Sequence, residues 1–305
     1  MEYLKDIREL IGNTPILKIS NFEIPEGINI FAKLEFLNPG GSVKDRACLY
    51  MIKDAEERGL LKKGGTLIEP TAGNTGIGLA LAALNRGYRV IFVVPDKFSV
   101  EKQLLMKALG AEIVNTPKEE GMKGAIKKAE ELAREIEGSF IPNQFINMAN
   151  VRAHYETTGP EIYRQLDGNI DLFVAGAGTG GTFTGVVKYL KEKNNKVKAV
   201  LADPVGSIIG GGGEVGCYNI EGIGNSFIPD TMDTSLIDEV EKISDEEAFN
   251  AVKELHRREG LIVGPSSGAA FTAAMRQAMK AKAPCNIVVV FPDRGDRYFS
   301  KNLYE

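Results

Sequence analysis

The chain has 305 residues, of which 43% are hydrophobic, and a formal net charge of −4. Its length predicts two packed domains. Because acidic and basic residues nearly balance, the chain lacks the positive field with which proteins bind nucleic acids or anionic membranes. No stretch approaches the roughly 20 apolar residues of a membrane span, and residues 1–10 mix acids and bases, so a cytoplasmic protein without a membrane partner is expected.

Short segments rich in β-branched residues alternate with longer helical patterns, which is typical of a parallel α/β sheet. In chain order, the first half predicts helix 47–52, strand 66–69, helix 75–84, strand 89–94, helix 100–109, strand 112–115 and helix 121–136. The second half predicts strand 171–175, helix 182–191, strand 198–202, helix 245–258, strand 261–263, helix 268–279 and strand 286–291. The predicted fold class is therefore α/β, with two layered domains and mainly parallel sheets.

The polar stretch 141–150 separates the two halves, so we predict an N-terminal domain over residues 1–147 and a C-terminal domain over residues 148–305. A cleft between two such sheets is the natural binding site. Residues 204–233, with four consecutive glycines at 210–213, are too long and too aperiodic for a plain connector. They form a candidate flap or wall, and a surface loop is the alternative.

The cysteines and histidines limit the chemistry that is available. Cys48, Cys217 and Cys285 are an odd number at wide spacing, which fits neither a disulfide framework nor a metal-binding CxxC motif. His154 and His256 are the only histidines, which excludes a histidine-rich metal site and leaves two candidates for a histidine-dependent triad. We therefore predict reduced thiols and no metal site.

A glycine-rich turn at residues 173–182 joins a predicted strand to a predicted helix. Such a turn presents backbone N–H groups and the positive helix end to a phosphate. Gly176, Gly178 and Gly181 also match the GxGxxG pattern of dinucleotide-binding proteins. Asp203 ends the next strand about twenty residues further on, so dinucleotide binding is an alternative, as is a plain tight turn.

A second turn of the same kind, at residues 71–76, follows strand 66–69 and opens a helix, so it is a second candidate anion site. One site suits a cofactor phosphate and the other an α-carboxylate, whereas a dinucleotide needs a single diphosphate cradle. The alternative for Asn74 is that it is an ordinary turn residue with no role in binding.

Lys44 follows a glycine turn and begins an apolar helix. The helix macrodipole disfavours a cation at this end and helps to lower the pKa of an amine, which suits a nucleophile. The alternative is a surface lysine that pairs with Asp45 or Glu35.

Six segments, in the same order over nearly the whole chain, resemble the cysteine synthase and cystathionine β-synthase family. They are IGNTP at 11–15, PGGSVKDR at 39–46, EPTAGNTGIGLA at 69–80, GTGGTFTG at 178–185, EGIG at 221–224 and GPSSGAA at 264–270. The resemblance implies the tryptophan-synthase-β type of fold (fold type II), with pyridoxal 5'-phosphate in the cleft between the domains. It also implies that part of residues 13–36 packs with the C-terminal domain.

The resemblance implies roles for individual residues. Lys44 matches the Schiff-base lysine, Asn74 the residue that binds the cofactor's phenolic oxygen, and Ser266 the partner of the pyridine nitrogen. The residues matching the phosphate loop are Gly178, Thr179, Gly180, Gly181 and Thr182. The residues matching the substrate site are Thr71, Ala72, Gly73, Asn74, Thr75, Gln144 and Gly222. A serine at the ring nitrogen, unlike an aspartate, leaves the ring without full protonation, which favours β-elimination over transamination.

The implied reaction is a β-replacement through an aminoacrylate intermediate, with an amino acid and a thiol as substrates. Ala72 stands where many cysteine synthases have serine, and in this the chain resembles the bacterial members that join O-acetylserine to homocysteine. We therefore expect O-acetylserine plus sulfide or homocysteine to give cysteine or cystathionine, and we expect a homodimer.

The main alternative is cysteine as first substrate, with release of hydrogen sulfide and formation of serine or lanthionine. Cysteine has a leaving group that must be protonated, which favours an extra acid near the β-carbon. The candidate acids are Asp203, Glu221, Asp230 and Asp233. An NAD-binding oxidoreductase and a catalytically silent cofactor-binding protein are more remote alternatives.

Overall fold

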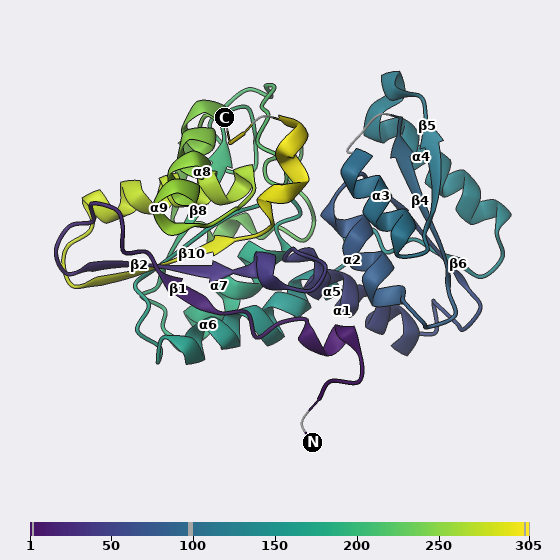
Figure 1. The fold of residues 1–305 in the computed structure, drawn as a ribbon, viewed down its shortest axis with the longest axis horizontal. Coiled ribbons are helices and arrows are strands. Elements are labelled where there is room, and N and C mark those ends of the chain that lie inside the picture. The colour runs from purple at the N-terminus through teal and green to yellow at the C-terminus, as the bar shows by residue number, and fades with distance from the viewer. Residues whose placement is uncertain (2, 97–99, 302, 305) are drawn as a thin grey trace. The chain divides into compact units, whose positions relative to one another are not determined.

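The computed structural model describes residues 1, 3–96, 100–301, 303 and 304. The chain forms two compact units, each with its own sheet (Figure 1). The first unit comprises Met1–Ile11 and Lys44–Asn150, and the second comprises Gly12–Val43 and Val151–Glu305. Among the described residues, no helix is both long and apolar enough to cross a bilayer.

The first unit is built on a four-stranded parallel sheet in the order β5-β4-β3-β6. Its strands are β3 (Thr66–Pro70), β4 (Arg89–Pro95), β5 (Glu112–Thr116) and β6 (Ser139–Phe140), and its helices are α1 (Lys44–Glu57), α2 (Asn74–Ala83), α3 (Val100–Ala108) and α4 (Gly121–Glu135). In β4, Phe92 and Val94 pack on the side of α1 and α2, whereas Ile91 and Val93 pack on the side of α4. Helices therefore cover both faces, as a parallel sheet requires.

The second unit is built on a six-stranded sheet in the order β1-β2-β10-β7-β8-β9, in which only β1 is antiparallel to its neighbour. Its strands are β1 (Ile16–Lys18), β2 (Ile28–Leu34), β7 (Leu172–Gly176), β8 (Lys198–Pro204), β9 (Glu239–Ile243) and β10 (Cys285–Phe291). Its helices include α6 (Gly159–Gln165), α7 (Gly181–Lys193), α8 (Asp245–Glu259) and α9 (Pro265–Lys280), and the short α5 (Ala149–Ala153) lies where the chain passes from the first unit to the second.

The core of the second unit lies on both faces of this sheet. Ile287 and Val289 of β10 pack on the side of α8 and α9, whereas Val288 and Val290 pack on the side of α6 and α7, and Figure 1 shows these helix pairs on opposite faces. The sheet contains β2, which comes from near the N-terminus and pairs in parallel with β10.

The two predicted sheets and the order of most elements match the structure, but several details differ. The strand predicted at 261–263 is wrong: Val263 forms only an isolated bridge to Arg294. Gly260, at a φ of 70°, ends α8, and Gly264 is the N-cap of α9, so residues 261–263 form the link between these two helices. The helix predicted from residue 268 begins at Pro265, whose fixed φ suits a first helical turn. Strands β1, β2, β6 and β9 and helices α5 and α6 were not predicted.

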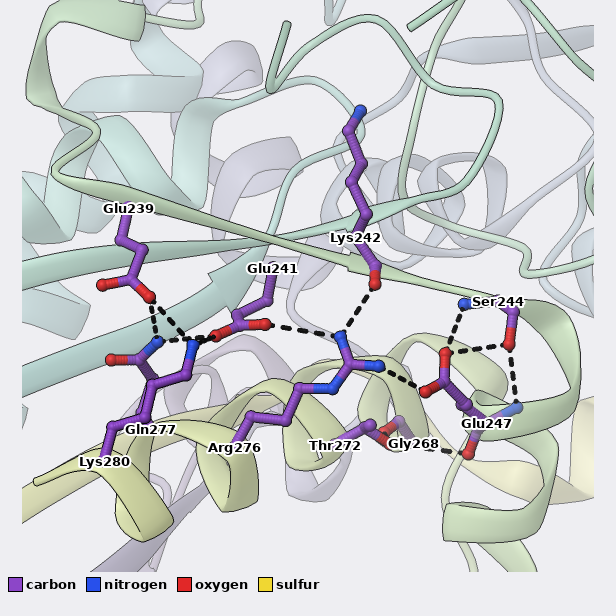
Figure 2. A network of polar contacts seen from close by, with 10 residues as sticks. All are labelled: Glu239, Glu241, Lys242, Ser244, Glu247, Gly268, Thr272, Arg276, Gln277 and Lys280. Atoms are coloured by element: carbon purple, nitrogen blue, oxygen red, sulfur yellow. Dashed lines mark hydrogen bonds and ion pairs between the residues drawn. The ribbon is translucent and has the colours of Figure 1, made fainter. Parts of the chain in front are cut away.

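Strand β9 is held to α9 by a polar network (Figure 2). The side-chain amide of Gln277 donates to Glu239 at 2.6 Å and to Glu241 at 2.7 Å. Arg276 donates to the backbone oxygen of Lys242 at 2.9 Å and pairs with Glu247 of α8. The network therefore ties the edge strand and both helices together, and it fixes the helix whose N-terminus carries Ser266.

Candidate active site

Lys44 is the first residue of α1, where the helix begins after the glycine turn. Helix α2 packs so closely here that a Cβ atom on Gly78 would lie 3.1 Å from the backbone oxygen of Lys44. One turn further along α1, the thiol of buried Cys48 donates to the backbone oxygen of Thr75 at 3.4 Å. The first unit thus brings the start of α1 and the start of α2 together.

The predicted substrate residues lie where β3 leads into α2: Thr71, Ala72 and Gly73 form the turn, and Asn74 and Thr75 begin the helix. Gly73 is the N-cap and offers no side chain to the first turn of the helix, which suits this end to an anion.

Gln144 comes from a different part of the chain, after β6, and its side chain reaches the same turn. The hydroxyl of Thr75 donates to Oε1 of Gln144 at 2.6 Å. Both side chains are buried. The structure therefore brings together the predicted carboxylate-binding residues that lie about seventy positions apart.

The predicted phosphate loop lies between β7 and α7, a helix of 13 residues. Gly178 is in close contact with the 221–224 loop, because a Cβ atom on it would lie 2.4 Å from the backbone oxygen of Gly222. Gly180 has a φ of 85°, which favours glycine. The side chain of Asn225 donates to the backbone oxygen of Gly178 at 2.7 Å, and that of Thr231 donates to the backbone oxygen of Thr179 at 2.5 Å. These two carbonyl groups of the loop therefore have hydrogen-bond partners within the second unit.

His154 contacts this loop through Thr182 and was not predicted as a site residue. It is 1% exposed and begins a π-helical turn, η4 (His154–Thr158). Its Nε2 atom is 3.2 Å from the hydroxyl of Thr182, and its Nδ1 atom is 2.9 Å from the hydroxyl of Thr158. Single π-helical turns are frequent at functional sites, but nothing in the sequence marks one here.

Ser266 lies in the first turn of α9 and is 2% exposed. Gly222, which has a φ of 91°, is its neighbour: a Cβ atom on this glycine would lie 3.8 Å from the Ser266 hydroxyl. The second unit therefore brings the phosphate loop, Gly222 and Ser266 together.

Three of the four candidate acids bind partners within the second unit. Asp203 is buried, pairs with Lys242 at 2.6 Å and accepts from the amide of Gly210 at 3.0 Å, while Glu221 pairs with Lys301. Asp233 caps the short helix η5 (Thr234–Leu236), and hydrogen bonds from Ser235 lower the pKa of its carboxyl group. Asp230 is exposed. Asp203, Glu221 and Asp233 therefore have structural partners of their own.

The second unit fits a cofactor phosphate at the start of α7. A tight glycine loop, a left-handed Gly180 and the first turn of a long helix are the features that let backbone N–H groups approach a phosphate. The hydroxyl of Thr182 adds a side-chain donor at the same point. Among the described residues, no group of three or more His, Cys, Asp or Glu side chains is arranged to hold a metal ion.

Comparison with known proteins supports a pyridoxal-phosphate site over a dinucleotide site. The model of the family described as pyridoxal-phosphate dependent enzyme matches residues 7–293. The chain is 55% identical over 305 residues to the O-acetylserine dependent cystathionine beta-synthase of Bacillus subtilis, covering 100% of this chain and 99% of the relative. It is 48% identical over 306 residues to a cysteine synthase of Helicobacter pylori, with both chains fully covered.

Solved structures agree with this match. The structure of O-acetylserine dependent cystathionine beta-synthase from Helicobacter pylori has a TM-score of 0.94 and 48% identity, and covers 100% of both chains. The structure of a hydrogen sulfide-producing enzyme from Fusobacterium nucleatum has a TM-score of 0.92 and 41% identity, and covers 97% of this chain and 100% of the other.

Proposed function

We propose that this chain, which belongs to the cysteine synthase family of pyridoxal-phosphate-dependent enzymes, joins O-acetylserine to a thiol by β-replacement. The acceptor is homocysteine or sulfide, and the product is cystathionine or cysteine. The observation that carries the proposal is the contact between Thr75 and Gln144 beside the start of α1, because it forms a site for an amino acid next to the lysine of the family. The names of the relatives support the choice of donor.

When bound, pyridoxal phosphate withdraws electrons from the α-carbon of an amino acid attached to it. In the proposed site, the amides of residues 178–182 and the hydroxyl of Thr182 hold the phosphate, and Asn74 bonds the phenolic oxygen. Ser266 faces the ring nitrogen. A neutral hydroxyl there does not force the ring to stay protonated, which favours loss of a β-substituent over transamination.

The remaining residues act on the substrate. The amides of residues 71–75 and the side chain of Gln144 bind the α-carboxylate at the start of α2. The amine of Lys44 takes the proton from the α-carbon and later returns it to the same carbon. Lys44 therefore serves as base and then as acid in one cycle, and the proposal requires no metal.

Cysteine as donor is the second candidate, and the likeness to the Fusobacterium nucleatum enzyme is the observation that favours it. Acetate leaves as a stable anion, whereas the sulfur of cysteine leaves far more readily when it is protonated. The ion pairs of Asp203 and Glu221 give these carboxylates structural partners, which supports O-acetylserine as the first choice.

The test mixes purified, cofactor-loaded protein separately with O-acetylserine and with cysteine. The protein is expected to be yellow, to change its spectrum with O-acetylserine, and to form product when sulfide or homocysteine is added. Lys44→Ala is expected to lose turnover. Rapid sulfide release from cysteine, with no spectral response to O-acetylserine, would replace the first proposal by the second. A colourless protein that binds NADH would overturn both. The homodimer stays a prediction that light scattering can test.

A further inference from the structure

Glu69 places a carboxyl group in the interior of the first unit. It belongs to β3, where Leu67 and Ile68 are fully buried, and it is itself 2% exposed. Burial of a charge is costly unless the charge is paired. Within the described part of the chain, no lysine or arginine pairs with Glu69. Its partners are backbone amides instead.

The carboxyl group of Glu69 holds the turn that precedes Gln144. Its Oε2 atom accepts from the backbone amide of Asn143 at 3.1 Å, and the amide of Gln144 also bonds to it. Burial raises the pKa of Glu69 to about 7, and these two amides oppose part of that rise. Both amides stabilise the charged form, so their bonds are strongest when Glu69 is ionised.

The turn that Glu69 holds contains a left-handed residue. Asn143 has a φ of 51°, in the left-handed region that residues other than glycine seldom adopt. The backbone oxygen of Asn143 accepts from the amides of Ile146 and Asn147 at 3.2 and 3.1 Å, so the turn is tight as well as left-handed. Contacts with the surroundings stabilise such a conformation, and the Glu69 carboxyl group supplies one of them.

Glu69 therefore connects both parts of the carboxylate site. Two residues after it, the chain reaches Thr71, which begins the turn into α2. Through its bonds to the amides of residues 143 and 144, it sets the backbone from which the Gln144 side chain reaches Thr75 at 2.6 Å. The backbone oxygen of Gln144 is fixed on its other side by the Asn150 side chain at 3.0 Å.

We propose that Glu69 is a positioning residue, which holds the Gln144 side chain against Thr75 and so sets the affinity of the enzyme for its amino acid donor. The inference rests on the proposed function of this site. Glutamine could not replace Glu69 fully, because its neutral side chain has a single acceptor oxygen and accepts more weakly from the two N–H donors than a carboxylate does.

The test compares the wild type with Glu69→Gln at pH 8, where the carboxyl group is ionised in the wild type. Both proteins are loaded with pyridoxal phosphate and titrated with O-acetylserine while the spectrum is followed. The dissociation constant of O-acetylserine is expected to rise about tenfold or more in the variant, as expected for a lost charged hydrogen bond. The KM for sulfide and the cofactor content should stay unchanged. Glu112→Gln, in the exposed ion pair with Arg89 of the same sheet, is the matched control and should bind the donor as the wild type does.

Two further variants separate positioning from a general structural role. Asn143→Gly should restore much of the donor affinity of Glu69→Gln, because glycine adopts the left-handed conformation without help. The effects of Glu69→Gln and Gln144→Ala should not add, because both act through one side chain. If Glu69→Gln gives no folded protein, Glu69→Asp, which keeps the charge but shortens the reach, is used in the same comparison.

An unchanged donor affinity in the folded variant would overturn the inference. Equal losses for donor, sulfide and cofactor, or full additivity with Gln144→Ala, would also overturn it, since they would indicate a structural role. A wild type that responds to neither O-acetylserine nor cysteine would instead contradict the proposed function itself, which keeps the two failures apart.

Discussion

The hydroxyl of Thr182, in the predicted phosphate loop, lies 3.2 Å from Nε2 of His154. His154 in turn contacts Thr158 within the same π-helical turn, so its ring has a defined orientation. The threonine hydroxyl can therefore contact this ring and still present its other side to an anion.

Thr182→Ala should weaken the binding of pyridoxal phosphate by roughly 1.5–3 kcal/mol, the worth of one hydrogen bond to a charged group. Thr182→Ser keeps the hydroxyl and should retain most of the affinity. The measurement is the cofactor dissociation constant, obtained from absorbance during titration of the cofactor-free protein. An alanine variant with unchanged affinity would place the phosphate elsewhere.

Ser266→Asp should keep the cofactor but slow β-replacement, because a carboxylate beside the ring nitrogen favours its protonation. Side reactions such as transamination should then become detectable. The visible spectrum and the rate of product formation test this, and Ser267→Ala, at the fully buried neighbouring position, is the control. Kinetics and spectrum that match the wild type would show that Ser266 does not face the ring.

The stability of the protein should depend on pH through Glu69. Its pKa is raised from 4.5 to about 7, so the folded state binds the proton more tightly than the unfolded state. This stabilisation is complete below about pH 4.5 and is lost as the pH rises through about 7. Between pH 5 and pH 8, the wild type should therefore lose roughly 3 kcal/mol relative to Glu69→Gln. Denaturation curves of both proteins at several pH values measure the difference, and parallel curves would contradict it.

Gln277→Ala should destabilise the second unit by about 1–3 kcal/mol, because it leaves the buried carboxylate of Glu241 with fewer partners. Lys280 pairs with the same carboxylate, but 58% of its side chain is exposed. Lys280→Ala should therefore lower the free energy of unfolding less, by about 0–1 kcal/mol. Denaturant midpoints of the two variants test the order, and a larger effect for Lys280 would contradict it.

The six motifs predicted the family and the fold class correctly, and both are confirmed. Strands such as β4 and β8 were predictable because nearly all their residues are apolar and buried on both faces. Strand β9 was not, because three of the five residues of its sequence EVEKI are charged, and these charges find their partners on α9 and β8, far away in the sequence. Tertiary contacts, rather than local propensity, decide such a strand.

The loops of the candidate site were predictable from glycines placed between a strand and a helix, whereas the groups that support them were not. His154 gives no local signal, since its partner Thr182 lies 28 positions away. Glu69 did leave a signal, a carboxylate inside the apolar strand TLIEP, but the amides that it holds are 74 positions further on. The roles assigned to individual site residues stay predictions until the variants are measured.

The pairing of β2 with β10 affects how the chain reaches its native state. Asn29, in β2, bonds with Asn286, 257 positions later, so β2 cannot pair with β10 until the ribosome has added those residues. Contacts between residues so far apart in the sequence form slowly, and an apolar strand that is still unpaired can pair with a wrong strand. Residues 44–150 of the first unit leave the ribosome much earlier. We therefore expect the sheet of the second unit to close after translation ends, with the N-terminal strands as the part of the nascent chain that most needs protection.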